Sequence, residues 1–100
     1  MLEHLSREQF AENLNTKFKI YLTPETFVEA ELTEVSEIRK RPRQEAFSLL
    51  FLALTDTAFE QAGYRIEHPT LGSDILFLVP VEKTERGIFY EVLFNRLTDD

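Results

Sequence analysis

The stretch KFKIYLTPETFVEAEL, residues 17–32, decides the fold. Apolar side chains occupy alternate positions on both sides of a Thr-Pro-Glu turn, which is the period of a strand with one buried face. A register that places Ile20 beside Val28 also places Lys19 opposite Glu29. Because the apolar face and the charged face agree on this register, the stretch predicts an antiparallel hairpin.

A short helix is predicted before the hairpin, over about residues 7–13. Ser6 and Gln9 have the spacing of a capping box, in which each side chain bonds the backbone N–H of the other residue. Leu5 and Phe10 have the spacing of a hydrophobic staple at the same helix start. The helix is therefore expected to lie with its apolar face on other elements.

Strand patterns separated by Gly and Pro continue to the end of the chain. The second strand needs a bulge, because Leu32 and Val35 are an odd number of positions apart. Residues 39–45 form a charged connection around Pro42, and Gly87 suits a left-handed turn position. The predicted strands cover about residues 16–22, 26–38, 46–54, 64–68, 75–81 and 88–95. They predict one mainly β domain, residues 1–100: a six-stranded antiparallel barrel or rolled sheet with one short N-terminal α-helix.

Composition narrows the class of protein. The chain of 100 residues has a formal net charge of −7 and no cysteine, which excludes disulfides, thiolate metal sites and a cysteine nucleophile. It contains no apolar run of membrane-spanning length, no signal-peptide pattern and no glycine-rich phosphate loop. We expect a soluble, cytoplasmic protein without a cofactor, and its acidity disfavours nucleic acid as a partner.

The later strands are apolar on both faces, which is unusual for a soluble sheet. Alternation shows that one set faces in and the other out, and leaves open which is which. In a small closed barrel, the set assigned to the interior is Phe47, Leu49, Phe51, Ile75, Phe77, Val79, Ile88, Tyr90, Val92 and Phe94. The other set then points outward and forms a candidate interface: Leu50, Leu52, Leu76, Leu78, Phe89 and Leu93. Fully burying one such side chain is worth about 1.5–3 kcal/mol, so we expect something to cover the second set.

Two kinds of cover are considered for this outward set. The helix, with Leu5, Phe10 and Leu14, can lie across it, helped by Phe59. A helix is about 10–12 Å wide and strands lie about 4.7–4.9 Å apart, so one helix covers two strands well and three poorly. The remaining surface predicts a second subunit or another protein partner.

A cluster of cations gives a second candidate surface. Arg39, Lys40, Arg41 and Arg43 concentrate four of the eleven Lys and Arg residues in five positions. No aromatic residue is interleaved with them for base stacking, so nucleic-acid binding is not expected. The run is interpreted as a solvated loop or as a charged docking loop for an acidic protein surface.

No combination of residues predicts an active site or a metal site. His68, Ser73 and Asp74 supply the residue types of a nucleophilic triad, but they flank a single turn and lack an oxyanion hole. His4 and His68 are the only histidines and lack the spacing of metal ligands.

A carboxylate pair on the first hairpin is also considered. Glu29 and Glu31 lie about 6.6–6.8 Å apart on one strand face, a separation that a glycosidase uses. Lys19 and Lys17 are their predicted cross-strand partners, which indicates a solvated charge ladder instead. The protein is expected not to be an enzyme.

The chain resembles a family of small bacterial domains of unknown function, loosely associated with genes for phage-tail-like or collar proteins. The resemblance rests on residues 64–69 (YRIEHP), 71–72 (LG), 77–81 (FLVPV) and 90–95 (YEVLFN), with further support from residues 47–51 and from the Leu5 to Phe10 pattern. It implies a structural role and no established activity, cofactor or catalytic residue.

Two functional hypotheses follow. The first is a non-enzymatic structural or protein-interaction module that binds a protein partner or itself, as a component of or adaptor to a phage-tail-like assembly. The alternative is a barrel that binds a small apolar ligand around Phe47, Phe51, Phe77 and Tyr90.

Overall fold

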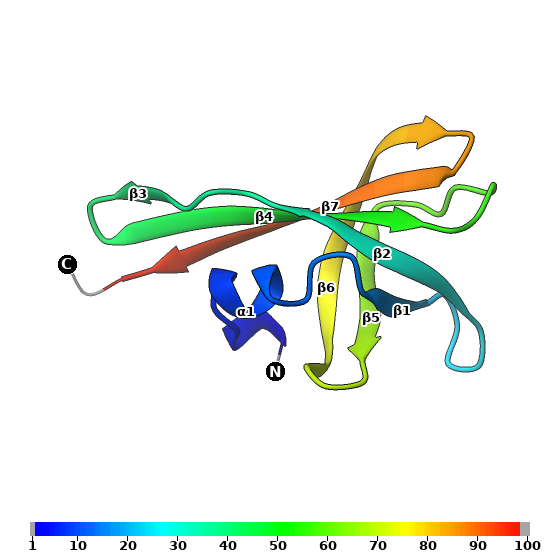
Figure 1. Cartoon of the computed structure of the whole chain (residues 1–100), viewed down its shortest axis with the longest axis horizontal. Coiled ribbons are helices and arrows are strands. Elements are labelled where there is room, and N and C mark those ends of the chain that lie inside the picture. The colour runs from blue at the N-terminus through cyan, green and yellow to red at the C-terminus, as the bar shows by residue number, and fades with distance from the viewer. Residues whose placement is uncertain (1, 99–100) are drawn as a thin grey trace.

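The computed structural model describes residues 2–98, so Met1, Asp99 and Asp100 of the predicted domain lie outside the described residues. The described chain is mainly β, with one 3₁₀ turn and one short helix before the strands (Figure 1). The elements are η1 (Leu2–His4), α1 (Arg7–Ala11), β1 (Lys17–Tyr21), β2 (Phe27–Val35), β3 (Arg39–Arg41), β4 (Gln44–Ala53), β5 (Ala62–His68), β6 (Gly72–Thr84) and β7 (Gly87–Leu97).

Six antiparallel strands close into a barrel. The sheet order is β2-β1-β5-β6-β7-β4-β3, and an additional pairing of β2 with β4 closes the ring. The predicted barrel is therefore confirmed. The predicted charged connection is wrong in one respect: Arg39–Arg41 form the short strand β3, which pairs with β4.

The first hairpin has the predicted register. Ile20 pairs with Val28 and Lys19 with Glu29 across β1 and β2. The predicted bulge in β2 is also present, as a register shift between Leu32 and Glu34 against β4. The local alternation of apolar residues therefore specifies the register and the bulge, because a slip by one residue would move every apolar side chain to the solvent-exposed face.

The helix begins as predicted but covers a different face. Ser6 and Gln9 form the capping box, and α1 ends at Ala11. The Phe10 ring lies 5.4 Å from the Phe94 ring and 6.2 Å from the Phe47 ring, centroid to centroid. The helix therefore packs on the inner face of the sheet and not on the outward set, and Leu14 is exposed.

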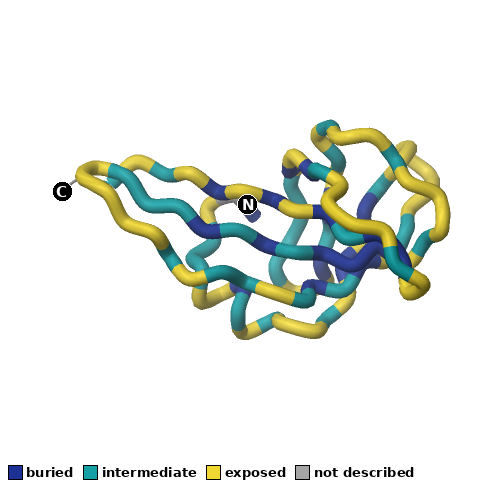
Figure 2. Tube along the Cα trace, turned by 90° about the horizontal axis from the view of Figure 1, so that it is seen from above, coloured by how far each residue is buried: buried dark blue, intermediate teal, exposed yellow. Residues whose placement is uncertain are grey.

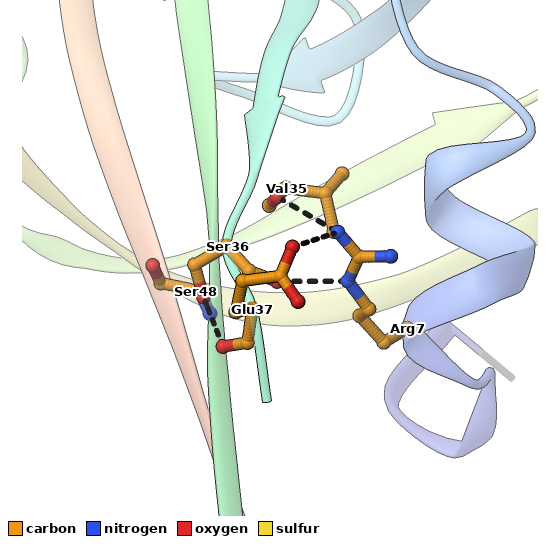
Figure 3. A network of polar contacts seen from close by, with 5 residues as sticks. All are labelled: Arg7, Val35, Ser36, Glu37 and Ser48. Atoms are coloured by element: carbon orange, nitrogen blue, oxygen red, sulfur yellow. Dashed lines mark hydrogen bonds and ion pairs between the residues drawn. The ribbon is translucent and has the colours of Figure 1, made fainter. Parts of the chain in front are cut away.

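Arg7 ties the helix to the end of β2 (Figure 3). Its Nε donates to the carbonyl of Ser36 at 2.8 Å, and its Nη2 donates to the carbonyl of Val35 at 3.3 Å. The same Nη2 lies 3.6 Å from the Glu37 carboxylate. Ser36 in turn exchanges bonds with Ser48 of β4, so a single side chain connects α1 to the closing pair of strands.

The core fills the barrel with the chain's own side chains. Phe18 meets Phe51 edge to face, with 5.0 Å between ring centroids. The buried apolar residues are Leu2, Phe10, Phe18, Ile20, Ala30, Leu32, Phe47, Leu49, Phe51, Ala53, Ile66, Leu76, Leu78, Ile88, Tyr90, Val92 and Phe94.

Part of the sheet projects from the barrel. We call it the wing: β3 with the adjoining parts of β4 and β7, residues 39–48 and 92–97. It extends to the left in Figure 1 and accounts for a long axis of 42 Å against 25 and 23 Å for the other two. Figure 2 shows that its tip is exposed or half-buried, whereas buried residues gather near the barrel.

Candidate docking surface

The strands β6 and β7 separate where the barrel meets the wing. They pair from Thr84 and Gly87 at their turn to Val79 and Glu91. Beyond that point, the Gly72–Leu78 part of β6 pairs with β5. The Val92–Leu97 part of β7 pairs with β4. In Figure 1 the two strands then run in different directions, and α1 lies in the angle between them in this view.

Large apolar side chains surround this angle. Ile75 and Phe77 on β6 are 65% and 55% exposed, and Leu93 on β7 is 57% exposed. Leu97, at the end of β7, is 90% exposed. A surface hollow of about 400 Å³ lies between the strands, lined by Ile75, Phe77 and Leu93 among others. We call this surface, with Leu97, the β6–β7 cleft.

Only part of the predicted interface lies on the surface. Leu93 is exposed as predicted, and Leu50 and Phe89 are half-buried. The predicted place of Leu52, Leu76 and Leu78 on the outer surface is wrong, because all three are buried. The sequence reasoning also missed Leu97 and placed Ile75 and Phe77 inside.

A bulge at Val81 explains the reversal on β6. The register shifts between Pro80 and Glu82, so Tyr90 pairs with Pro80 instead of Val81. Counting back from Pro80 turns Leu78 and Leu76 toward the interior, whereas an unbulged hairpin would turn Ile75 and Phe77 inward. Pro80 was the available signal, because proline within a strand marks an edge or a bulge.

Leu52 is buried for a separate, local reason. It pairs with Phe89 on β7, near the β6–β7 turn. Its Cδ1 lies 3.4 Å from the position that a Gly87 Cβ would take. Phe89 and the turn therefore cover a side chain that alternation alone would leave outside.

The predicted charged docking loop lies at the tip of the wing. Arg39, Lys40 and Arg41 on β3 are exposed, and Arg43 in the following turn is exposed with a φ of 64°. Proline at 42 and a positive φ at 43 suit a type II turn. The sequence predicts this cluster correctly because the four residues are neighbours in the chain.

Folding brings the cations close to the apolar surface. Arg39 and Arg41 line a hollow of about 210 Å³ together with Ala46, Leu93 and Asn95. On the opposite face, the Arg96 guanidinium lies 4.8 Å from the Phe94 ring centroid. Because Leu93 and Asn95 line both this hollow and the hollow of the cleft, the cleft and the basic tip are parts of one surface region.

His68 has a structural role in the turn between β5 and β6. Its ring is buried, and its Nδ1 accepts the backbone N–H groups of Thr70 at 3.2 Å and Leu71 at 3.3 Å. Because Nδ1 is an acceptor, Nε2 carries the proton and donates to Thr16 Oγ1 at 3.1 Å. The Thr16 hydroxyl in turn donates a hydrogen bond to the Asn13 carbonyl at 2.7 Å.

This bonding excludes the nucleophilic triad considered from the sequence. Both ring nitrogens of His68 have turn or loop partners, and burial lowers the pKa of His68. Ser73 pairs with Glu67 in the β5–β6 ladder, and Asp74 accepts the N–H of Ile75. The three residues share a turn without the geometry of a proton relay.

The glutamates of β2 lie opposite the lysines of β1 in the predicted register. Glu29 pairs with Lys19 and Glu31 with Lys17. The Lys19 ammonium also lies 4.7 Å from the Phe27 ring centroid. No group of three metal-ligating residues exists within residues 2–98, and no helix in that range is long and apolar enough to cross a membrane.

Comparison with known proteins gives a family match over most of the chain. The model of a family described as "Domain of unknown function (DUF6916)" matches residues 5–94. No curated protein and no solved structure gives a significant match to the chain.

Proposed function

Since the chain belongs to the DUF6916 family, whose description assigns no activity, we propose from its geometry that the domain is a non-enzymatic protein-interaction module. It docks a protein partner through the β6–β7 cleft. The observation that carries the proposal is the exposure of Ile75, Phe77, Leu93 and Leu97 around two separating strands. Exposed apolar clusters of this kind mark interaction sites more often than scattered single residues do.

The free energy of burying the apolar side chains of the cleft favours their contact with a protein over their contact with water. Burial of one large apolar side chain gains about 1.5–3 kcal/mol when it is complete, and these four side chains are more than half exposed. Association costs about 4–15 kcal/mol, so the apolar contacts need help from other interactions. The adjacent cations of β3 supply electrostatic attraction toward an acidic partner surface.

The alternative, a barrel for a small apolar ligand, receives less support. Phe51 and Tyr90 are buried in the core, Phe47 packs against Phe10 and Phe94, and Phe77 lies outside. The four residues named for that site do not face one cavity. Interaction between proteins also suits the setting that the sequence resemblance implies, a phage-tail-like assembly built from many contacting subunits.

A site-specific crosslinker tests the docking proposal. A photoreactive phenylalanine analogue replaces Leu93 in the source cells, and the same analogue replaces Leu22 as the control. Leu22 is also exposed, at 40%, but it belongs to the β1–β2 turn. We expect one defined protein adduct from position 93 and none from position 22. Equal labelling at both positions, or no adduct at position 93, would overturn the proposal.

A further inference from the structure

The outer edge of β7 lacks a strand partner among the described residues. Its Val92–Leu97 part pairs with β4 on one side, while β6 departs on the other side after Val79. A strand edge of this kind presents N–H and C=O groups that can pair with another strand. The edge is six residues long and is flanked on its outer face by exposed leucines.

The direction of the peptide groups follows from a single bond. The N–H of Thr98 donates to the Arg43 carbonyl at 2.9 Å, so the peptide groups of residue 98 face β4. Peptide groups alternate in direction along a strand. Leu93, Asn95 and Leu97 therefore direct their N–H and C=O groups toward the open edge.

The edge is complementary to a second copy of itself. Leu93 and Leu97 lie at equal distances in sequence on either side of Asn95. Antiparallel pairing about a two-fold axis at Asn95 places Leu93 of each copy opposite Leu97 of the other. The exposed leucines then bury one another on the outer face, and Asn95 faces its own counterpart.

We infer that this domain self-associates through β7, with the partner of the β6–β7 cleft being a second copy of the same chain. The inference rests on the proposed function and specifies its partner. Three residue pairs, centred on Asn95, exchange about six backbone hydrogen bonds between the copies. The β3-β4-β7 sheet of one copy continues as the β7-β4-β3 sheet of the other.

Charge favours this antiparallel arrangement. Within residues 39–48 and 92–97, the wing has five cations against one carboxylate, that of Glu45, in a chain whose formal net charge is −7. The rest of the chain is therefore strongly acidic. Antiparallel pairing places the tips at opposite ends of the joint sheet, each beside the other copy's acidic barrel, whereas parallel pairing would bring the two tips together. The cations of the tip are Arg39, Lys40, Arg41, Arg43 and Arg96.

A single cysteine tests the two-fold axis. The chain has no cysteine, so Asn95→Cys introduces the only thiol. Opposite residues of a hydrogen-bonded antiparallel pair have Cα atoms about 5.5 Å apart, within the range that a disulfide spans. We expect Asn95→Cys to form a covalent dimer under mild oxidation at least ten times faster than the exposed control Leu22→Cys.

A proline provides an independent test. Asn95→Pro removes an N–H that faces the open edge and leaves the bonds to β4 intact. Asn95→Ala is the matched control, because both variants lose the side-chain bond between Gln44 and Asn95. In sedimentation equilibrium, we expect Asn95→Ala to dimerise with nearly the wild-type Kd and Asn95→Pro to raise the Kd at least tenfold. Circular dichroism checks that both variants are folded.

The outcomes separate this inference from the proposed function. A wild-type chain that stays monomeric at several hundred micromolar, or equal oxidation rates for the two cysteine variants, overturns the self-association. If the position-93 crosslinker then captures a different protein, the docking function stands and only the identity of the partner is wrong. If it captures nothing, both are wrong.

Discussion

Tyr90 and Phe59 lie face to face, with ring centroids 4.1 Å apart and an angle of 6° between the ring planes. The Tyr90 hydroxyl donates to the Phe59 carbonyl at 3.0 Å and accepts the Phe59 N–H at 2.8 Å. One core side chain therefore satisfies both backbone groups of a residue in the connection between β4 and β5. This contact holds the connection between β4 and β5, which contains neither helix nor strand, against the barrel.

Replacing Tyr90 with Phe tests the value of these two bonds. The ring stack remains in Tyr90→Phe, but the N–H and C=O of Phe59 lose their partner. We expect the free energy of unfolding to fall by about 1–3 kcal/mol, as measured by urea denaturation. Hydrogen exchange at the Phe59 amide should speed up more than exchange in β7. An unchanged urea midpoint would mean that water replaces the hydroxyl at no cost.

Stability is predicted to depend on the ionisation of His68. Burial lowers the pKa of His68 below its ordinary value of 6.5, so the unfolded chain binds this proton more tightly than the folded chain. The free energy of unfolding therefore decreases as the pH falls through 6.5, and this contribution levels off below the folded-state pKa. At higher pH the neutral ring keeps Nδ1 as an acceptor, and the contribution is fully present.

His68→Asn isolates this dependence. The Asn side-chain oxygen can accept the turn N–H groups in place of Nδ1, but it does not titrate. The stability advantage of wild type over the variant should shrink between pH 7.5 and pH 5 in urea denaturation series. A constant difference over this range would contradict the assignment of Nδ1 as a buried acceptor.

Leu78 and Leu93 offer a matched pair on opposite faces of the sheet. Leu78 is fully buried, so Leu78→Glu places a carboxylate in the core and is expected to unfold the domain. Leu93 is exposed, so Leu93→Glu should change the free energy of unfolding by less than about 0.5 kcal/mol. Circular dichroism and thermal melts distinguish the two variants. If Leu78→Glu were folded, Leu78 would have to face outward, and the bulged register of β6 would be contradicted.

Gly87 is required by the turn between β6 and β7. Its φ is +149°, and a Cβ at this position would lie 2.2 Å from the Ala53 carbonyl oxygen. We expect Gly87→Ala to lower the free energy of unfolding by at least about 1–3 kcal/mol. Gly63→Ala is the control, since its Cβ would meet only the Ile75 Cγ2 at 3.1 Å, and Ile75 is exposed enough to move. Similar losses in both variants would argue against backbone strain at Gly87.

The barrel was predictable because its evidence is local. The register of Ile20 with Val28 and the capping box at Ser6 each depend on residues a few positions apart, and both are confirmed. The site was only partly predictable. Leu93 lies on the predicted outer face because β7 pairs with β4 without a bulge. Phe77 lies on the opposite face from the predicted one because Val81 is an extra residue in β6.

The remaining features depend on tertiary geometry. The alternation of apolar residues in β6 and β7 does not reveal where the two strands separate, because β6 stays paired with β5 and β7 stays paired with β4. The burial of Leu52 likewise results from Phe89 and the Gly87 turn beside it. The direction in which α1 packs was missed for the same reason: its apolar residues fit either face of a sheet that is apolar on both.

The bulge at Val81 has a consequence for how this sequence can change during evolution. In an ordinary amphipathic strand, loss of one residue would drive polar side chains into the core. Here, deletion of Val81 would remove the bulge and leave Leu76 and Leu78 inside. A one-residue slip that retained Val81 without a bulge would exchange them for Ile75 and Phe77, so one apolar set would replace another. The hairpin is therefore buffered against single-codon insertions and deletions, at the cost of always displaying hydrophobic residues outside.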